Sequence, residues 1–362
     1  MKSTLALSIL SDVMGWDDAT CREEFSWLQM AAKYRFDRYR GFQPGVRFLE
    51  SLVGWLQQFR PEHRATAYDF VRTRVLYIGS DELAHLVGAA YPSQIRPRLI
   101  EELASTMGVA SHEVWTQPNA ISEYQSILRQ SLFLGLSDGA RIDEFRRVNE
   151  GLVSNEQVTT TVQLDEDKWI DLRDELQRDL DDPNARFRFA FLLDDFVGSG
   201  TTFLRRGEDG SVKGKLAKFW SSVEAISTDL FAADWVICVI HYVASHQASE
   251  VLPARVDELV PDLGTGMGQV ECNFGLVLPE DFPLNATPHP FLDLLPEYYD
   301  PAIETRHTGP DIWLGFKQCG LPLVLEHNTP NNSIALLWAE TEGKGGAHRM
   351  RPLFRRRQRH VS

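Results

Sequence analysis

Apolar positions in the first third of the chain recur at helical spacing. The clearest stripe repeats every three or four residues and comprises Val46, Leu49, Leu52, Val53, Leu56 and Phe59. Such a stripe is typical of a helix with one face on a core, and Pro61 ends it. The pattern over 70–78 predicts a second helix, Ser80 begins a third, and Gly108 ends a fourth. We therefore expect residues 1–115 to form a helical N-terminal region.

From residue 116 onward the pattern changes to short apolar runs that lead into polar loops. These runs cover residues 132–136, 187–193, 235–243 and 321–325. Because helical stretches alternate with them, the pattern favours an α/β domain with a mostly parallel sheet flanked by helices. Loops that follow parallel strands share the carboxyl edge of the sheet, where ligands bind. We expect this domain to span residues 116–362, with an irregular insertion around 279–310 and a basic C-terminal tail.

The loop after residues 187–193 carries the most informative chemistry. Asp194 and Asp195 end the run, and because an unpaired buried carboxylate is costly, they should face solvent, a cation or a hydroxyl-rich ligand. The next polar positions are Gly198, Ser199, Gly200, Thr201 and Thr202. Backbone N–H groups of a glycine-rich turn that opens a helix form a phosphate cradle. Carboxylates for a diol beside such a cradle indicate a 5-phosphorylated ribose.

This segment resembles the signature of type I phosphoribosyltransferases. The resemblance implies that Asp194 and Asp195 hold the ribose hydroxyls of phosphoribosyl pyrophosphate and that residues 198–202 wrap its 5-phosphate. It also implies the type I phosphoribosyltransferase-like α/β fold, and a Mg²⁺ ion that bridges the pyrophosphate and the ribose hydroxyls. Asp194 and Asp195 would meet this metal only indirectly, through the ribose.

Most of the chain further resembles bacterial phosphoribosyltransferase-like proteins that are proposed as effectors in anti-phage conflict systems. This wider resemblance rests on residues 136–141, 327–332 and 351–357. In those proteins a helical N-terminal part precedes the transferase-like core.

The loop that follows residues 132–136 contains Ser137, Asp138 and Arg141. Type I enzymes often place a pyrophosphate-binding loop before the signature strand. The resemblance therefore implies that Ser137 and Asp138 contact the substrate. The guanidinium of Arg141 would bind pyrophosphate oxygens and stabilise the departing anion. A simple Asp-Gly turn beside a solvated arginine is an alternative interpretation.

Polar residues at three further places in the chain have two open interpretations each. His327 and Asn328 follow the run 321–325; they either recognise a base or form a turn that caps the next helix. His241 lies near the end of the run 235–243. It is either a general acid/base or a packed core histidine. Lys213 and Lys215 either reach a phosphate or lie in a solvated loop.

The charge of the chain narrows the class of protein. Its 362 residues carry 37 Lys and Arg and 51 Asp and Glu, a net charge of −14, which disfavours a general nucleic-acid or anionic-membrane binder. The four cysteines form no CxxC pair, so a zinc ribbon is excluded, and we expect a cytoplasmic protein. Basic residues gather at the tail: Arg349, Arg351, Arg355, Arg356, Arg357 and Arg359. Docking on the protein itself or on a protein partner is favoured there over nucleic acid.

Other interpretations of the Asp-Asp segment are weaker. A Walker B strand would require a GxxxxGK[ST] loop, which the sequence lacks. A haloacid-dehalogenase-type site needs a second Asp two positions after the first, where this chain has Phe196. A capped strand with a glycine turn is the purely structural alternative. We expect a protein that binds phosphoribosyl pyrophosphate or a nucleotide and acts at the anomeric carbon, as an anti-phage effector. A non-catalytic nucleotide or sugar-phosphate sensor, or an interaction component of a defence complex, is the alternative.

Overall fold

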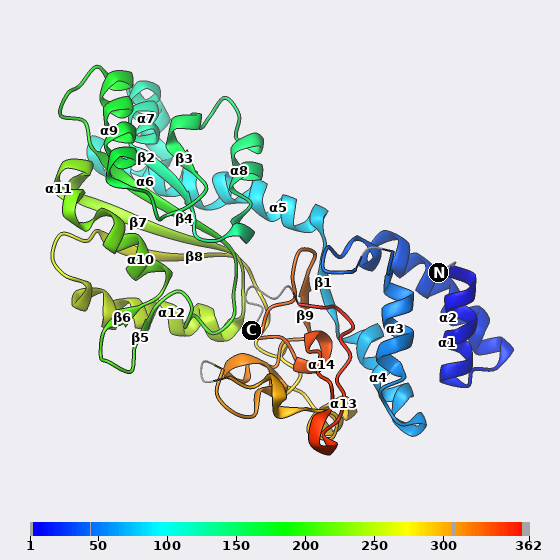
Figure 1. Cartoon of the computed structure of the whole chain (residues 1–362). Helices are drawn as coiled ribbons and strands as arrows, with labels where there is room; N and C mark the ends of the chain where they lie inside the picture. The colour runs from blue at the N-terminus through cyan, green and yellow to red at the C-terminus, as the bar shows by residue number, and fades with distance from the viewer. Residues whose placement is uncertain (1–2, 44, 306–307, 357–362) are drawn as a thin grey trace. The chain divides into compact units, whose positions relative to one another are not determined.

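The computed structural model describes residues 3–43, 45–305 and 308–356, and the chain forms two compact units (Figure 1). Unit 1 lies within residues 1–82 and 279–362, and unit 2 comprises residues 83–278. The division therefore differs from the expected boundary at residue 115. Residues 83–115 belong with the α/β unit, and the C-terminal segment belongs with the N-terminal helices.

Unit 2 is built on a five-stranded, fully parallel sheet. Its strands lie in the order β3 (Val158–Thr159), β2 (Ser131–Gly135), β4 (Phe187–Val197), β7 (Phe231–Ala244) and β8 (Gln269–Val277). The predicted α/β class is thus confirmed, and three of the four predicted apolar runs are strands of this sheet. The sequence pattern did not reveal β3 and β8, because β3 is very short and β8, at the sheet edge, is only partly buried.

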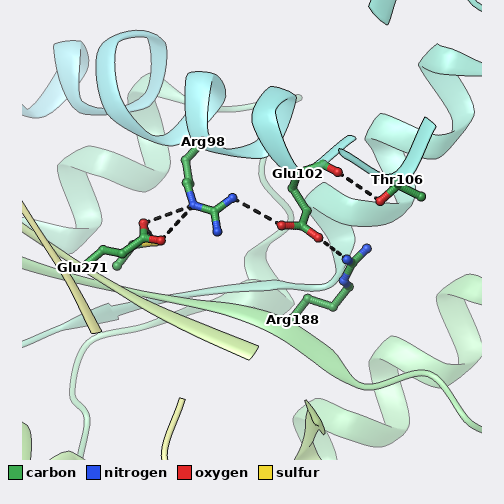
Figure 2. A network of polar contacts seen from close by, with 6 residues as sticks. Arg98, Glu102, Thr106, Arg188 and Glu271 are labelled. Atoms are coloured by element: carbon green, nitrogen blue, oxygen red, sulfur yellow. Dashed lines mark hydrogen bonds and ion pairs between the residues drawn. The ribbon is translucent and has the colours of Figure 1, made fainter. Parts of the chain in front are cut away.

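Helices cover both faces of the sheet. In chain order they are α5 (Ser80–Ala90), α6 (Arg96–Met107), α7 (Ala120–Arg129), α8 (Ile142–Val148), α9 (Glu166–Leu180), α10 (Lys215–Val223), α11 (Ser227–Leu230) and α12 (His246–Leu259). On one face α9, α10 and α12 pack their apolar sides on alternate strand residues such as Leu192 and Val239. On the other face Phe145 of α8 lies 5.2 Å from Phe133, and Arg98 of α6 lies 5.0 Å from the Phe189 ring. Ion pairs also tie α6 to β4 and β8 (Figure 2).

Unit 1 combines helices with a two-stranded parallel sheet. Its main elements are α1 (Ser3–Met14), α2 (Asp18–Tyr34), α3 (Phe48–Leu56), α4 (Pro61–Thr73), β1 (Leu76–Ile78), α13 (Pro290–Leu294), β9 (Leu323–Leu325) and α14 (Ala335–Trp338). The helix expected over 70–78 is wrong in its second half, because the helix ends at Thr73 and residues 76–78 form β1. Across the described part of the chain, no helix is both long and apolar enough to cross a membrane.

The run 321–325 does not join the large sheet. Its strand β9 pairs with β1, so the expectation that its following loop shares an edge with the Asp-Asp segment is wrong. A three-residue apolar strand gives the same local pattern whichever partner it takes. Its partner is a property of the folded chain, not of the run.

The C-terminal segment is anchored in the core of unit 1. Leu353 and Phe354 are fully buried, and the Phe354 ring lies 5.6 Å from Phe36 and 5.2 Å from Tyr39. The irregular insertion joins the same core through Leu284, Phe291, Leu295 and Tyr298. The basic tail therefore docks on its own chain up to this point; Arg357 and Arg359 lie outside the described residues.

Candidate functional site

The candidate site lies at the carboxyl edge of the unit 2 sheet, where the loops after β2, β4 and β7 meet. Asp194 and Asp195 belong to β4 itself, and Asp194 stands beside His241 of β7 in the parallel register. Because side chains alternate along a strand, the two carboxylates project to opposite faces of the sheet. This alternation gives the two aspartates different surroundings.

Asp194 is buried in a polar cluster. Its side chain is 1% exposed and forms an ion pair with Lys215, while the Ser137 hydroxyl donates to its Oδ1 at 2.6 Å. The Nε2 atom of His241 lies 3.9 Å from Oδ2. Burial raises the pKa of Asp194, and the ammonium of Lys215 opposes that rise. Of the three surroundings expected for this carboxylate (solvent, a cation or a hydroxyl-rich ligand), Asp194 has a cation, and that cation is an internal lysine.

The position of Lys215 depends on a short hairpin. The strands β5 (Arg205–Arg206) and β6 (Val212–Lys213) pair between the glycine loop and α10, so the expectation that the loop itself opens a helix is wrong. Gly214 has φ +135°, and a Cβ there would overlap the carbonyl of Phe203. The next amide, of Lys215, donates to the Thr202 carbonyl at 3.2 Å.

His241 is a neutral, packed residue. It is 1% exposed, and burial together with the charge of Lys215 lowers its pKa to about 3. Its ring lies 5.6 Å from that of Phe203, and Nδ1 has no hydrogen-bond partner among the described residues. A histidine of such low pKa carries no proton at neutral pH, so the packed interpretation is the one its surroundings favour.

Asp195 lies on the other face, half-buried against the loop after β2. Its Oδ1 accepts the Phe196 amide at 2.8 Å, and its carboxylate rests so close to Gly139 that a Cβ there would overlap it. The neighbouring hydroxyl of Tyr242 is buried without a hydrogen-bond partner in the described chain. Burial, then the nearby carboxylates of Asp194 and Asp195, raise the pKa of Tyr242. Buried hydroxyls without a partner are rare in proteins.

The glycine loop presents consecutive backbone donors. Between Gly198 and Thr202 no amide N–H donates to any described residue, although Gly198, Ser199 and Gly200 are buried. Such unpaired buried amides are rare in proteins. The hydroxyls of Ser199 and Thr201 lie 2.9 Å apart, and Gly200 holds the left-handed conformation at φ +71°.

The glycine loop, residues 198–202, is hydrogen-bonded to α12 and lies at the N-terminus of this helix. Ser245 caps this helix by accepting the Ala248 amide at 3.0 Å and donates to the Gly198 carbonyl at 2.5 Å. Arg255, on the same helix, donates to the Ser199 carbonyl at 3.2 Å. The positive end of a helix therefore lies at the loop, but it belongs to the helix that follows β7 and not to one that follows the loop.

The other predicted site residues are divided between the units. Arg141 is at the carboxyl edge and forms an ion pair with Glu144 at 2.8 Å, and Asp138 is exposed beside it. His327 and Asn328 lie in unit 1, in the turn after β9. Their role in base recognition stays a prediction. Tyr242 is the polar residue of the site that sequence reasoning did not assign, whereas Lys215, expected at a phosphate or in a solvated loop, pairs with Asp194.

The arrangement of potential metal ligands bears on the expected Mg²⁺ ion. No group of three or more His, Cys, Asp and Glu side chains in the described ranges is arranged to hold a metal ion. Asp194 is neutralised by Lys215. The Mg²⁺ ion that the resemblance implies, carried by the pyrophosphate and the ribose, stays a prediction, and no chemical step is assigned to it.

Comparison with known proteins identifies the family. The family model PRTase-CE matches residues 52–356, which include most of unit 1 and all of unit 2. No curated protein and no solved structure gives a significant match. The match covers the Asp-Asp segment and the glycine loop as well as the anchored C-terminal segment. The chain therefore belongs to the PRTase-CE family, the phosphoribosyltransferase-like effectors of conflict systems.

Proposed function

We propose that unit 2 binds a 5-phosphorylated ribose, as phosphoribosyl pyrophosphate or a nucleotide, and acts at its anomeric carbon. One observation carries the proposal: the amides of residues 198–202 have no acceptor among the described residues, and they lie at the N-terminus of α12. A phosphate at this place would accept several N–H groups at once and lie in the favourable field of the helix.

The roles of the aspartates follow from their different surroundings. A ribose whose 5-phosphate occupies the loop extends toward the end of β4, where Asp195 is half-exposed and suited to its hydroxyls. Asp194 reaches the same ligand only if Lys215 leaves it. A ligand phosphate attracts the ammonium of Lys215. In this proposal, binding of the ligand therefore draws Lys215 away from Asp194. Positive charge that develops on the sugar as the C1–O bond lengthens is then stabilised by both carboxylates.

Mg²⁺ enters this proposal only as the counter-ion that a pyrophosphate brings with it. The chain's own contribution is the set of backbone donors, the two carboxylates and the guanidinium of Arg141 near the departing anion. Arg141 is paired with Glu144, so we assign it to the pyrophosphate only in the ligand-bound state.

The experiment measures melting temperature and binding heat with phosphoribosyl pyrophosphate, with and without Mg²⁺. Gly200→Asp adds a side chain at a φ of +71°, where a Cβ would lie 3.1 Å from Arg255 Nη1 and 3.2 Å from Leu252 Cδ1 of α12, so the loop must shift and binding should be abolished. Asp195→Asn should weaken it by about tenfold or more, the loss of one charge-assisted hydrogen bond. The matched control is Gly210→Asp, because Gly210 also has a positive φ, of +79°, but faces open space on the hairpin. Equal affinity in the Gly200→Asp variant, or no saturable binding of this ligand or of nucleotides to the wild type, would refute the proposal.

A non-catalytic sensor is the second candidate, and one observation favours it. Two groups expected to act on the substrate are held in internal ion pairs, Asp194 with Lys215 and Arg141 with Glu144. Pyrophosphate release or nucleotide breakdown by the purified protein would support the enzyme. Saturable stabilisation without turnover would support the sensor.

A further inference from the structure

A cavity opens at the amino edge of the unit 2 sheet, where β4 and β7 begin, opposite to the candidate site. Phe187 pairs with Phe231 and Phe189 with Val236, so a single residue of β4 faces four residues of β7. This irregularity pushes residues 232–235 away from β4. The result is a cavity of about 520 Å³, a volume within the range of small-molecule sites.

This cavity is distinct from the candidate site at the carboxyl edge. Arg188 lines the cavity and Asp195 lies seven residues further along the same strand. At about 3.3 Å per residue these positions are roughly 20 Å apart. One ligand of nucleotide size therefore does not occupy both.

Two arginines, Arg186 and Arg188, line the cavity. Arg186 donates to the carbonyls of Thr228 at 2.9 Å and Asn184 at 3.3 Å, and it has no carboxylate partner among the described residues. Backbone acceptors fix the guanidinium without neutralising it. A positioned and uncompensated guanidinium is a good receptor for a planar or tetrahedral oxyanion.

Neutral and acidic groups complete the lining. The side-chain amides of Gln130 and Asn184 make no hydrogen bond to any residue that the structure describes. Asp182 is exposed, and its Oδ1 accepts the backbone N–H of Asn184 at 2.9 Å. A purely anionic ligand would be repelled by this carboxylate. The lining is thus suited to a molecule with an anionic end and a second end that bears hydroxyl or amino donors.

The second arginine is linked to a network on the sheet face. Figure 2 shows Arg188 paired with Glu102, which also accepts Arg98 at 3.3 Å, and Arg98 in turn contacts Glu271 at 3.1 Å. Since Glu102 is shared, it keeps one arginine partner if Arg188 turns to a ligand. Withdrawal of Arg188 therefore leaves no unpaired buried carboxylate.

We propose that the cavity at the amino edge binds a small phosphate ester that carries hydroxyl or amino groups, with its phosphate on Arg186 and Arg188. This site is separate from the proposed ribose-phosphate site. It is coupled to α6, because Glu102 competes with the ligand for Arg188.

Ribose 5-phosphate and inorganic phosphate are the probes, titrated by calorimetry into the Gly200→Asp variant so that the glycine loop does not contribute. Saturable binding of ribose 5-phosphate is expected in this background, with weaker binding of inorganic phosphate. Adding Arg186→Gln should weaken the binding of ribose 5-phosphate at least tenfold. Adding Glu102→Gln should strengthen it several-fold, since Arg188 is then released from its competitor.

The control for Arg186→Gln is Arg178→Gln, because Arg178 is an exposed arginine of α9 that also donates to a backbone carbonyl, at 3.3 Å, and does not line the cavity. The proposal is overturned if ribose 5-phosphate does not bind in the Gly200→Asp background, or if Arg186→Gln and Arg178→Gln have the same effect. Should Gly200→Asp fail to fold, the same comparison is made in the wild type, where Arg186→Gln should remove one of two binding events. Loss of neither event would also refute the site. The proposed ribose-phosphate site is tested by a separate measurement. It fails if the Gly200→Asp variant binds phosphoribosyl pyrophosphate with the same affinity as the wild type.

Discussion

Lys215 compensates the buried negative charge of Asp194 near the end of β4. It is the cation beside a carboxylate that is 1% exposed. Lys215→Met removes that cation and leaves Asp194 buried without compensation. We expect a loss of about 3 kcal/mol in the free energy of unfolding, measured in urea.

Two controls separate this effect from a general loss of charge. Lys213→Met removes the neighbouring lysine, which pairs with Asp209 on the exposed hairpin, and should change the stability little. The double variant Asp194→Asn with Lys215→Met should recover most of the loss. If the single and double variants are equally unstable, the ion pair is not the cause.

His241 gives the protein a defined response to acid. Its pKa is lowered to about 3 in the folded chain, whereas an unfolded histidine titrates near pH 6.5. Below pH 6.5 the unfolded chain binds a proton that the folded chain refuses. Stability should therefore fall as the pH is lowered from about 6.5 toward 3, by about 1.4 kcal/mol per unit from this group alone.

The contribution of His241 is obtained by difference. Denaturant titrations of wild type and His241→Asn between pH 7 and pH 4 should show a smaller slope for the variant. His85→Asn, on the exposed side of α5, should keep the wild-type slope. Parallel slopes for wild type and His241→Asn would contradict the assignment.

The hairpin β5–β6 is the element that connects the glycine loop to the lysine. Gly214→Ala puts a methyl group against the Phe203 carbonyl at a φ of +135°. We expect a loss of about 2 kcal/mol or more, together with weaker ligand binding, because Lys215 and the loop would both shift. Gly210→Ala, at positive φ but in open space, should cost about 1 kcal/mol and leave binding unchanged. The two variants are compared by urea unfolding and by calorimetry, and equal effects on binding would contradict this role of the hairpin.

Elements with a strong local pattern could be predicted, and elements defined by distant contacts could not. The strands β2, β4 and β7, the capped start of α5 and the left-handed Gly108 after α6 were all expected from nearby residues. The Asp-Asp segment was located in the same way. The hairpin was not predicted as strands, because β5 and β6 have two residues each.

The ion pair of Asp194 lay beyond local pattern for a physical reason. Asp194 and Lys215 are 21 positions apart, and only the path of the hairpin brings them together. From the sequence, the two carboxylates were expected to face solvent, a cation or a hydroxyl-rich ligand. The local pattern does not show which of these each carboxylate meets, or that Lys215 is the cation beside Asp194.

At the scale of the whole molecule, the C-terminal segment is part of a core. Phe354→Ala should destabilise unit 1 by about 3–5 kcal/mol, because the ring is fully buried among aromatic neighbours. Urea unfolding followed by tryptophan fluorescence measures this loss. Arg351→Gln, on the exposed neighbour, should have little effect, and a similar loss in both variants would contradict the anchoring role. A search for a protein partner of the basic tail therefore requires arginine substitutions, since deletion of the segment would damage unit 1.

The division into units, unlike the strands, did not follow from the order of patterns along the chain. Helical stretches at the start suggested a separate N-terminal region, yet unit 1 is completed by residues from both ends. The parallel pair of β1 and β9 joins residues 76–78 to residues 323–325. The family match, over residues 52–356, likewise includes residues of both units.

The split composition of unit 1 sets an order of events during synthesis on the ribosome. Unit 2 is a continuous stretch that has emerged in full before β9 and Phe354 are translated. The nascent chain thus contains the whole of unit 2 while its first helices still lack the C-terminal residues they pack against. A ribosome that stops in the last tenth of the message would release a protein with a complete unit 2 and an incomplete unit 1.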